Sequence, residues 1–346
     1  MKDVKFIAVT GFFSSGSSAV VDLLKEYKDV YECSAEIRII KDPYGITQLE
    51  NALVHNWDLI NSAAAIRDFK WLCTICNRKR KGIFSPVGLS YSEKITKDFL
   101  RMTNEYIDDL STFKYKSDFY YQKFKKNYFR YVIDRIRMGT EFYTHGKIKS
   151  ANRKVEDSNF ALLTEEEFNE KTKKYLKSLF SYCIPEGKMS GIVVLDQAIS
   201  SNDPQAINRY FDDAKMIIVD RDPRDMYVED LVRWRENLDK DVSSKEAGYK
   251  YVIRHKALRK DIPNDGSVLC VKFEDLVINY NEIVSKIESF LGFSERDHIS
   301  KKMYLKPEIS SKNIGIWKQY YDDYKDAIDE IGRLLPEYCF DGGKEY

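Results

Sequence analysis

Five short apolar segments, rich in β-branched residues, are spread along the chain and predict the strands of a buried parallel sheet. They lie at residues 4–10, 30–33, 192–195, 215–220 and 268–273. Helical spacing of apolar residues follows the first strand at 17–28 and the last at 281–291, where Gly292 is a typical helix terminator. Strands that alternate with helices in this way indicate an α/β sheet with right-handed crossovers.

The middle of the chain has a different pattern. Residues 46–185 are mostly helix-like, polar and aromatic, and Ser92–Leu110 and Asp118–Met138 have the apolar stripe of amphipathic helices. We expect a single α/β domain over residues 1–346, in which 46–185 form a large helical insertion. Because segments added to a rigid scaffold often determine specificity, the insertion is a candidate ligand-binding region, with a plain helical cap as the alternative.

Composition limits the classes of function. Of 346 residues, 56 are Lys or Arg and 55 are Asp or Glu, so the net charge is only +1 and nucleic acid is not an expected partner. No apolar run approaches the roughly 20 residues that span a bilayer, so we expect no transmembrane segment and a cytoplasmic protein. Six scattered cysteines indicate free thiols, and the single C-x-x-C pair, Cys73 and Cys76, does not predict a metal site.

The clearest candidate for chemistry is the turn after the first strand, Thr10–Leu24 (TGFFSSGSSAVVDLL). Glycines let a backbone approach an anion, the start of a helix presents unpaired N–H groups, and serine hydroxyls add donors. Gly11 and Gly16 have the spacing of a P-loop, but Ser17 and Ser18 stand where nucleotide hydrolases have Lys-Ser/Thr. The missing lysine disfavours an ATPase or GTPase. The sequence predicts a P-loop-like sheet, with an ordinary glycine-serine turn as the alternative.

Together with later segments, this loop resembles the sulfotransferases that use 3′-phosphoadenosine 5′-phosphosulfate (PAPS). Ser15-Gly16-Ser17-Ser18 is similar to the Ser-Gly-Thr-Thr core of their phosphosulfate loop. The later segments follow in the family's order and are Arg221-Asp222-Pro223 after a strand, Lys272-Phe273-Glu274-Asp275-Leu276, Phe290-Leu291-Gly292 and Gly315-Ile316-Trp317-Lys318. The resemblance covers residues 4–45 and 190–335, and it leaves the helical middle aside.

The resemblance implies PAPS as the sulfonate donor and no metal. It implies that the loop binds the 5′-phosphosulfate, that Arg221 binds the 3′-phosphate and that a late segment closes over the nucleotide. The residues concerned are Ser14, Ser15, Gly16, Ser17, Ser18, Arg221, Asn313, Gly315, Trp317 and Lys318. An arginine at the carboxyl end of a strand suits this role, because a guanidinium binds phosphate bidentately at the edge where such sheets bind ligands. The alternative for Arg221 is an ion pair with Asp222 or Asp225.

Glu36 is the candidate catalytic base, because sulfonate transfer to a hydroxyl needs a base on the acceptor and positive charge near the sulfonate. It follows Gly16 by twenty residues, as the catalytic Glu does in the heparan-modifying carbohydrate sulfotransferases, which this stretch resembles. Arg38 stands where those enzymes have a basic His and would assist. The resemblance therefore implies a sugar hydroxyl as acceptor and a soluble bacterial enzyme. A solvent-exposed or ion-paired Glu36 without a catalytic role is the alternative.

Three places depart from the family pattern. One is Ser310 and Ser311, which stand where basic residues normally precede the Trp-Lys lysine, with Lys312 displaced. Ser14 stands where Lys or Arg is usual, so Arg38, Lys41 or Lys318 would have to supply that charge. Glu229 stands where a Ser normally shares the 3′-phosphate. Because a carboxylate repels a phosphate, we expect either that Glu229 points away from that site or that the register of the motif is shifted.

Two other functions stay open. One is a P-loop kinase-like phosphotransferase, in which Asp220 at the end of a strand would bind Mg²⁺. The other is an inactive nucleotide- or glycan-binding homologue. The sequence determines neither the acceptor nor the oligomeric state.

Overall fold

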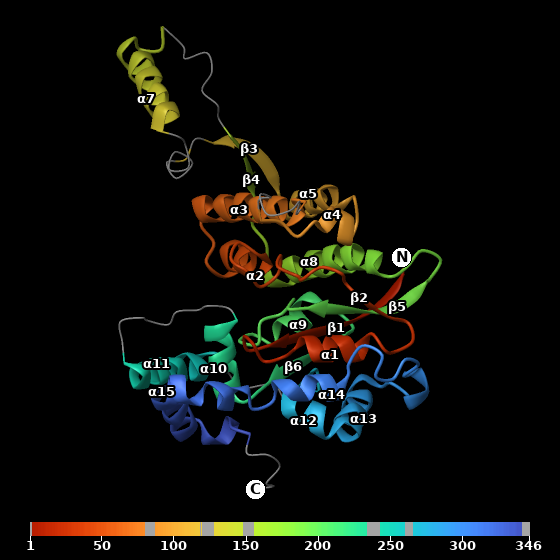
Figure 1. Cartoon of the computed structure of the whole chain (residues 1–346). Coiled ribbons are helices and arrows are strands. Elements are labelled where there is room, and N and C mark those ends of the chain that lie inside the picture. Colours follow the sequence, from red (N-terminus) through yellow and green to blue (C-terminus); the bar gives the residue numbers. More distant parts are fainter. Residues whose placement is uncertain are drawn as a thin grey trace.

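The computed structural model describes residues 2–79, 87–117, 119, 128–147, 156–233, 243–259 and 266–340. Its centre is a five-stranded parallel sheet in the order β2-β5-β1-β6-β7 (Figure 1). The strands are β1 (Asp3–Gly11), β2 (Val30–Glu32), β5 (Ser190–Asp196), β6 (Ala214–Asp220) and β7 (Val268–Lys272). Each strand lies at a segment that the sequence predicts. The parallel sheet, flanked by helices and with a glycine loop after β1, confirms a P-loop-like α/β fold.

Alternate side chains of β1 fill two separate cores, as the two-residue period of a strand requires. Phe6 and Ala8 belong to the larger core on one face of the sheet, and Ile7 and Val9 belong to the smaller core on the other. Helices of the carboxyl-terminal half, together with the helix after β1, cover the smaller core. They are α1 (Ser18–Leu24), α12 (Phe273–Ile278) and α13 (Tyr280–Leu291), followed in the chain by α14 (Pro307–Ser310).

The larger core is covered by two groups of helices. The first group stacks over the sheet and consists of α2 (Ile46–Glu50), α3 (Leu59–Asn77), α5 (Phe99–Leu110), α8 (Glu165–Phe180) and α9 (Ala206–Tyr210). The second group packs together beside the end of β6 and consists of α10 (Pro223–Val232), α11 (Ser244–Ala257) and α15 (Tyr321–Leu334) (Figure 1). The candidate loop after β1 therefore lies at the edge of the sheet that the second group also reaches.

The described part of segment 46–185 is mostly helical, but it also holds an antiparallel pair of strands, β3 (Phe113–Ser117) and β4 (Glu156–Phe160). The helix predicted at 92–110 is divided into α4 (Tyr91–Lys94) and α5. Of the helix predicted at 118–138, residues 118 and 120–127 lie outside the described residues. The described part is α7 (Tyr128–Tyr143), which projects beyond β3 and β4 (Figure 1).

Short turns of 3-10 or π-helix complete the chain. They are η1 (Asn51–His55), η2 (Ser181–Cys183), η3 (Glu295–Asp297), η4 (Ser311–Asn313), η5 (Ile316–Tyr320) and η6 (Pro336–Tyr338). The six cysteines are free thiols, and Cys73 and Cys76 are buried in α3. Among the described residues, no helix combines the length and the apolar character that a bilayer crossing needs.

Candidate active site

The loop between β1 and α1 is a tight turn whose shape depends on Gly16. Ser14 and Gly16 both have positive φ, at 54° and 82°. The Ser15 hydroxyl accepts a hydrogen bond from the Phe12 N–H at 3.1 Å, which closes the turn internally. A Cβ added to Gly16 would lie 2.7 Å from the ring of Phe273, the first residue of α12. The glycine therefore serves both a left-handed backbone and a close approach to an aromatic ring.

Replacing Gly16 by alanine is expected to destabilise the protein by about 2 kcal/mol, because the new methyl group meets both a backbone penalty and a steric clash. Gly187→Ala is the matched control. Gly187 also has a positive φ, 85°, but a Cβ there would meet no atom within 4 Å. Its cost should be about 1 kcal/mol, the backbone penalty alone. Denaturant unfolding of both variants measures the difference, and equal costs would show that Phe273 does not restrict the loop.

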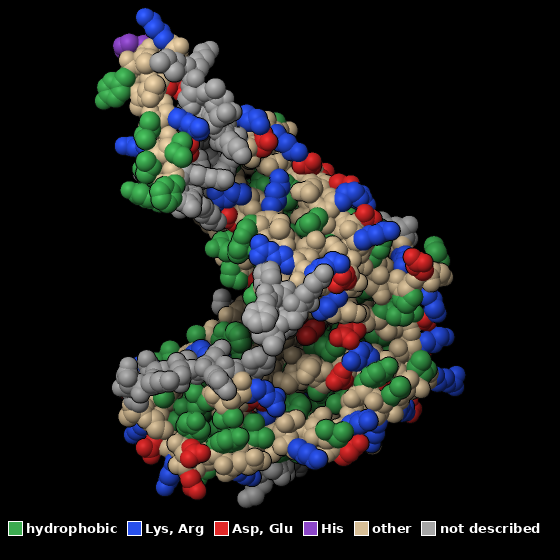
Figure 2. All heavy atoms as spheres, turned by 45° about the horizontal axis from the view of Figure 1, so that its top comes forward, with side chains coloured by type: hydrophobic (Ala, Val, Ile, Leu, Met, Phe, Trp, Pro, Cys, Tyr) green, Lys and Arg blue, Asp and Glu red, His purple; other side chains and the backbone are tan. Residues whose placement is uncertain are grey.

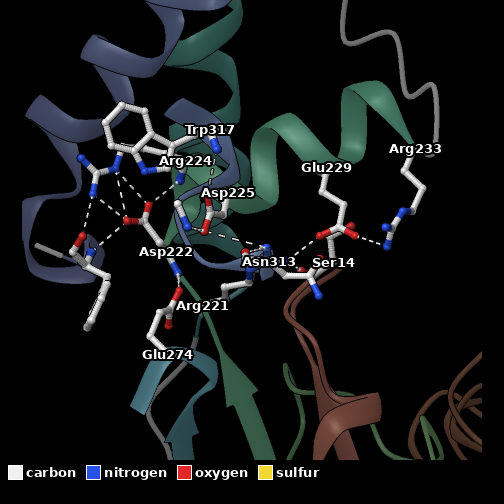
Figure 3. A network of polar contacts seen from close by, with 12 residues as sticks. Ser14, Arg221, Asp222, Arg224, Asp225, Glu229, Arg233, Glu274, Asn313 and Trp317 are labelled. Carbon is white, nitrogen blue, oxygen red and sulfur yellow. Dashed lines mark hydrogen bonds and ion pairs between the residues drawn. The ribbon is translucent and has the colours of Figure 1, made fainter. Parts of the chain in front are cut away.

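Arg221 joins the loop to two other segments at the carboxyl edge of the sheet (Figure 3). The residue directly follows β6 and is only 3% exposed. Its guanidinium donates to the Ser14 carbonyl at 2.9 Å, to the Glu229 carboxylate of α10 and to the carbonyl of Asn313. Its Nε has no partner among the described residues. The structure thus brings together Ser14, Arg221 and Asn313, which the family resemblance assigns to one nucleotide.

Glu229 does not point away from Arg221, so the first of the two alternatives for this residue is wrong. Its carboxylate pairs with Arg221 and, on the solvent side, with Arg233. The physical reason is that the buried guanidinium needs a counter-charge, and Glu229 provides it from the facing helix. The alternative partners expected for Arg221 play smaller roles, since Asp225 lies 3.8 Å from the guanidinium.

The next acid of α10 is also engaged with the loop. Asp230 accepts a hydrogen bond from the Ser14 hydroxyl at 2.6 Å and pairs with Arg254 of α11 at 2.6 Å. Ser14 stands where the family has a cation, and here its hydroxyl is hydrogen-bonded to a carboxylate. Acidic groups face the loop from α10, and a positive charge for a bound anion has to come from another element.

The Arg-Asp-Pro segment and the Gly-x-Trp-Lys segment are in direct contact. Asp225 accepts hydrogen bonds from the N–H groups of Gly315 at 2.7 Å and Trp317 at 3.0 Å, and burial raises its pKa. The guanidinium of Arg224 stacks on the Trp317 ring, 4.4 Å from its centroid. The sequence assigns both segments to the nucleotide, but only the fold shows that one positions the other. Lys318, the last residue of this segment in the predicted site, is exposed.

The Phe-Glu-Asp-Leu segment packs against the Arg-Asp-Pro segment that carries Arg221. Glu274 accepts a hydrogen bond from the Asp222 N–H at 2.9 Å, and its other carboxylate oxygen has no partner among the described residues. Burial raises the pKa of Glu274 to about 7. The ring of Phe273 lies under Arg221, with its centroid 5.2 Å from the guanidinium carbon. These residues position Arg221 and the loop rather than face a ligand.

Glu36 and Arg38 lie in an extended segment that follows β2 and runs beside β5. Their side chains form an ion pair at 2.6 Å and are 37% and 39% exposed. The buried hydroxyl of Tyr91 holds the backbone on both sides, since it donates to the Glu36 carbonyl at 2.7 Å and accepts from the Arg38 N–H at 2.9 Å. Nothing in the sequence pairs Tyr91 with this segment. The ion-pair alternative is thus realised in the geometry, and it leaves the carboxylate accessible.

Sequence reasoning missed two residues that follow the apolar run of β5. Asp196 is its last residue, and burial, with Glu36 and Glu32 adding negative charge, raises the pKa of Asp196 to about 6. Gln197 donates to the Ser17 hydroxyl at 3.0 Å and accepts from Lys41 at 2.7 Å. Their position could have identified them, because both residues directly follow a predicted parallel strand. Polar residues at the carboxyl ends of parallel strands gather at one edge of the sheet.

The comparisons with known proteins come from solved structures, since no family model and no curated protein matches the chain. It is similar to the sulfotransferase STF9 from Mycobacterium avium, at 12% identity and a TM-score of 0.37, over 98% of this chain and 76% of that one. It is also similar to the sulfotransferase domain from the curacin biosynthetic pathway, at 11% identity and a TM-score of 0.39, over 96% of this chain and 98% of that one. A third similar structure is retinol dehydratase in complex with androsterone and inactive cofactor PAP, at 16% identity and a TM-score of 0.28, over 53% of this chain and 67% of that one. These likenesses concern the fold alone.

Proposed function

We propose that the chain is a sulfotransferase that moves a sulfonate from PAPS to a hydroxyl group, with a carbohydrate as the first candidate acceptor. One observation carries the proposal. Arg221 makes direct contact with Ser14 of the loop and with Asn313, so the segments that resemble the PAPS site converge at the carboxyl edge of a parallel sheet.

The residues present fit a nucleotide with phosphates at two positions. The loop carries four serine hydroxyls and a left-handed backbone at Gly16, and Arg221 keeps an unpartnered Nε among the described residues. Ser15, Gly16, Ser17 and Ser18 would hold the 5′-phosphosulfate, and Arg221 would hold the 3′-phosphate once Glu229 yields. Asn313, Gly315, Trp317 and Lys318 would cover the nucleotide. PAPS would supply an activated sulfonate, and no metal is needed for this transfer.

The chemistry of the chain's own residues is that of a base and a charged environment. The Glu36 carboxylate would take the proton of the acceptor hydroxyl as its oxygen bonds to sulfur. The bond from sulfur to the 5′-phosphate oxygen breaks, and its electron pair stays on adenosine 3′,5′-bisphosphate. Arg38, which holds Glu36 at 2.6 Å, would orient that carboxylate.

The acceptor would lie on the hollowed side of the molecule. Figure 2 shows a broad hollow on the side of the molecule below its projecting arm. The resemblance of the Glu36 stretch to carbohydrate enzymes supports a sugar, and an extended saccharide suits an open concave face.

The two rival functions fare differently. A kinase would need Asp220 to bind Mg²⁺, but its carboxylate pairs with Arg259, which speaks against that role. An inactive nucleotide-binding homologue is favoured by one contact, the pair between Arg221 and Glu229, because it occupies the guanidinium.

The test is calorimetric titration with adenosine 3′,5′-bisphosphate, with ATP and Mg²⁺ as the comparison. We expect the bisphosphate to bind and Arg221→Ala to weaken it about tenfold, the scale of one charge-assisted hydrogen-bonded contact. Arg221→Lys keeps the charge in case the alanine variant does not fold, and it should also bind more weakly because it lacks the fork. Arg209→Ala on α9, where Arg209 pairs with Asp203, is the control.

Each other outcome has a distinct meaning. ATP binding without bisphosphate binding would overturn the sulfotransferase and favour the kinase. Bisphosphate binding without transfer of labelled sulfonate to a broad panel of sugars, phenols and alcohols would favour the inactive homologue.

A further inference from the structure

The loop after β1 has no cation of its own, although it would hold a doubly charged phosphosulfate. Ser14 stands at the family's cationic position and donates to the carboxylate of Asp230. In P-loop enzymes a lysine at the loop reaches the phosphates and offsets their charge. The sequence offers three substitutes, Arg38, Lys41 and Lys318, and the structure distinguishes them.

Two of the three are directed elsewhere. Arg38 pairs with Glu36 at 2.6 Å and with Asp42 at 3.3 Å, so two carboxylates already share its charge. Lys318 is exposed, and its ammonium nitrogen lies 5.7 Å from the centroid of the Trp317 ring. Within the described part of the chain, it makes no hydrogen bond to the loop.

Lys41 is connected to the loop through one side chain. Its ammonium donates to Gln197 Oε1 at 2.7 Å, and Gln197 Nε2 donates to the Ser17 hydroxyl at 3.0 Å. Gln197 also accepts from Thr10, the residue before the loop, at 3.1 Å. A single amide therefore separates Lys41 from the loop, at the edge where β1 and β5 end side by side.

The electrostatic surroundings of Lys41 are a second observation. Among the described residues it forms no ion pair, although Asp42, Glu36 and Asp196 lie near enough to act on it through space. Burial is the largest influence and lowers the pKa of Lys41. A partly buried ammonium without a directly paired carboxylate is costly, and an anion placed beside it offsets that cost. The site thus favours a negatively charged ligand group.

We propose that Lys41 provides the positive charge missing from the loop and faces the 5′-phosphosulfate, with Gln197 holding it in place. The inference rests on the proposed function and names the cation of that site. Lys41 would stabilise the electron pair left on the 5′-phosphate oxygen when its bond to sulfur breaks, while the acceptor oxygen takes the sulfonate and Glu36 takes the proton. The charge that the family carries on the loop is here carried by the segment after β2.

Truncated ligands locate the contact without any turnover. Calorimetry compares adenosine 3′,5′-bisphosphate with adenosine 3′-phosphate, which lacks the 5′ group. Lys41→Met, which keeps most of the apolar stem, should weaken the bisphosphate about tenfold and leave the 3′-phosphate unchanged. Lys41→Arg should recover part of the loss. Arg221→Lys should weaken both ligands.

Lys70→Met is the matched control. Lys70 is also partly buried, its pKa is lowered by burial, and it donates to the amide oxygen of Asn159 at 3.4 Å, far from the loop in the insertion. It should change neither affinity. Thermal unfolding of each variant confirms that the folded protein is compared.

The outcomes separate the two levels of the proposal. Equal weakening of both ligands by Lys41→Met, or no weakening, overturns the role of Lys41 and leaves the sulfotransferase standing. Failure of the unsubstituted protein to bind the bisphosphate overturns the sulfotransferase, and the role of Lys41 with it.

Discussion

Replacing Glu36 by glutamine is expected to lower turnover about 10²–10⁴-fold, the usual contribution of a general base, and to leave bisphosphate affinity unchanged. Glutamine keeps the size and one oxygen of the side chain, so the segment held by Tyr91 should keep its backbone hydrogen bonds. The ability to take a proton is lost, together with the negative charge that pairs with Arg38. The measurement is bisphosphate release from PAPS in the presence of a saccharide panel, with calorimetry alongside.

Glu32→Gln is the control for this experiment. Glu32 lies at the end of β2 and has a side chain 36% exposed, close to the 37% of Glu36, but it pairs loosely with Lys25 at 3.6 Å. Its turnover should stay normal. Asp196→Asn tests the rival base, whose pKa near 6 also suits proton transfer. If Glu36→Gln keeps full turnover while Asp196→Asn loses it, the base is Asp196 and the family-based assignment is wrong.

Replacing Glu229 by glutamine should increase affinity for adenosine 3′,5′-bisphosphate about 10–100-fold. In the structure the Glu229 carboxylate occupies the guanidinium of Arg221 and would repel a phosphate there. Glutamine removes that charge, and its neutral amide oxygen is a weaker acceptor that a phosphate can displace from Arg221. A hydrogen bond between the freed guanidinium and a phosphate oxygen contributes about 1.5–3 kcal/mol, which sets the expected range.

Adenosine 5′-phosphate is the control ligand, because it lacks the 3′ group and its affinity should not change. Unfolding of the variant is measured in parallel, since loss of one partner of a buried pair can destabilise the protein. If affinity for the bisphosphate falls or stays constant, the pair of Arg221 and Glu229 is a permanent structural contact. The inactive homologue would then be the better description of the chain.

The parallel sheet could be predicted because its strands are buried on both faces and therefore read as continuous apolar runs. The division of segment 92–110 into α4 and α5 could not be predicted, because the helical spacing of its apolar residues continues across the break between them. There the Asp98 N–H turns to the Thr96 hydroxyl at 3.3 Å, a local hydrogen bond that competes with the helix. The strands β3 and β4 were hidden for another reason. Phe113 and Phe160 stack at 4.6 Å although they are distant in sequence, and no local signal announces such a pair.

In the candidate site, motif positions were predictable and their partners were not. The resemblance identifies Arg221 and Trp317, and the sequence offered Asp225 only as an ion-pair partner of Arg221. In the structure Asp225 holds the backbone of Gly315 and Trp317, which is a positioning role. The expectation that Glu229 points away considered only its repulsion of a bound phosphate. It overlooked that the buried guanidinium of Arg221 needs a counter-charge, which Glu229 provides.

Local pattern alone was enough for the order of strands along the chain, the glycine loop and the motifs at strand ends, because periodicity and turn chemistry act over a few residues. The choice of Lys41 over Arg38 and Lys318 needed the fold. Lys41 and Gln197 are 156 residues apart in sequence and meet only because β2, β5 and β1 lie side by side in the sheet. Burial then determines which charges are left without partners, and burial is a property of the packed structure.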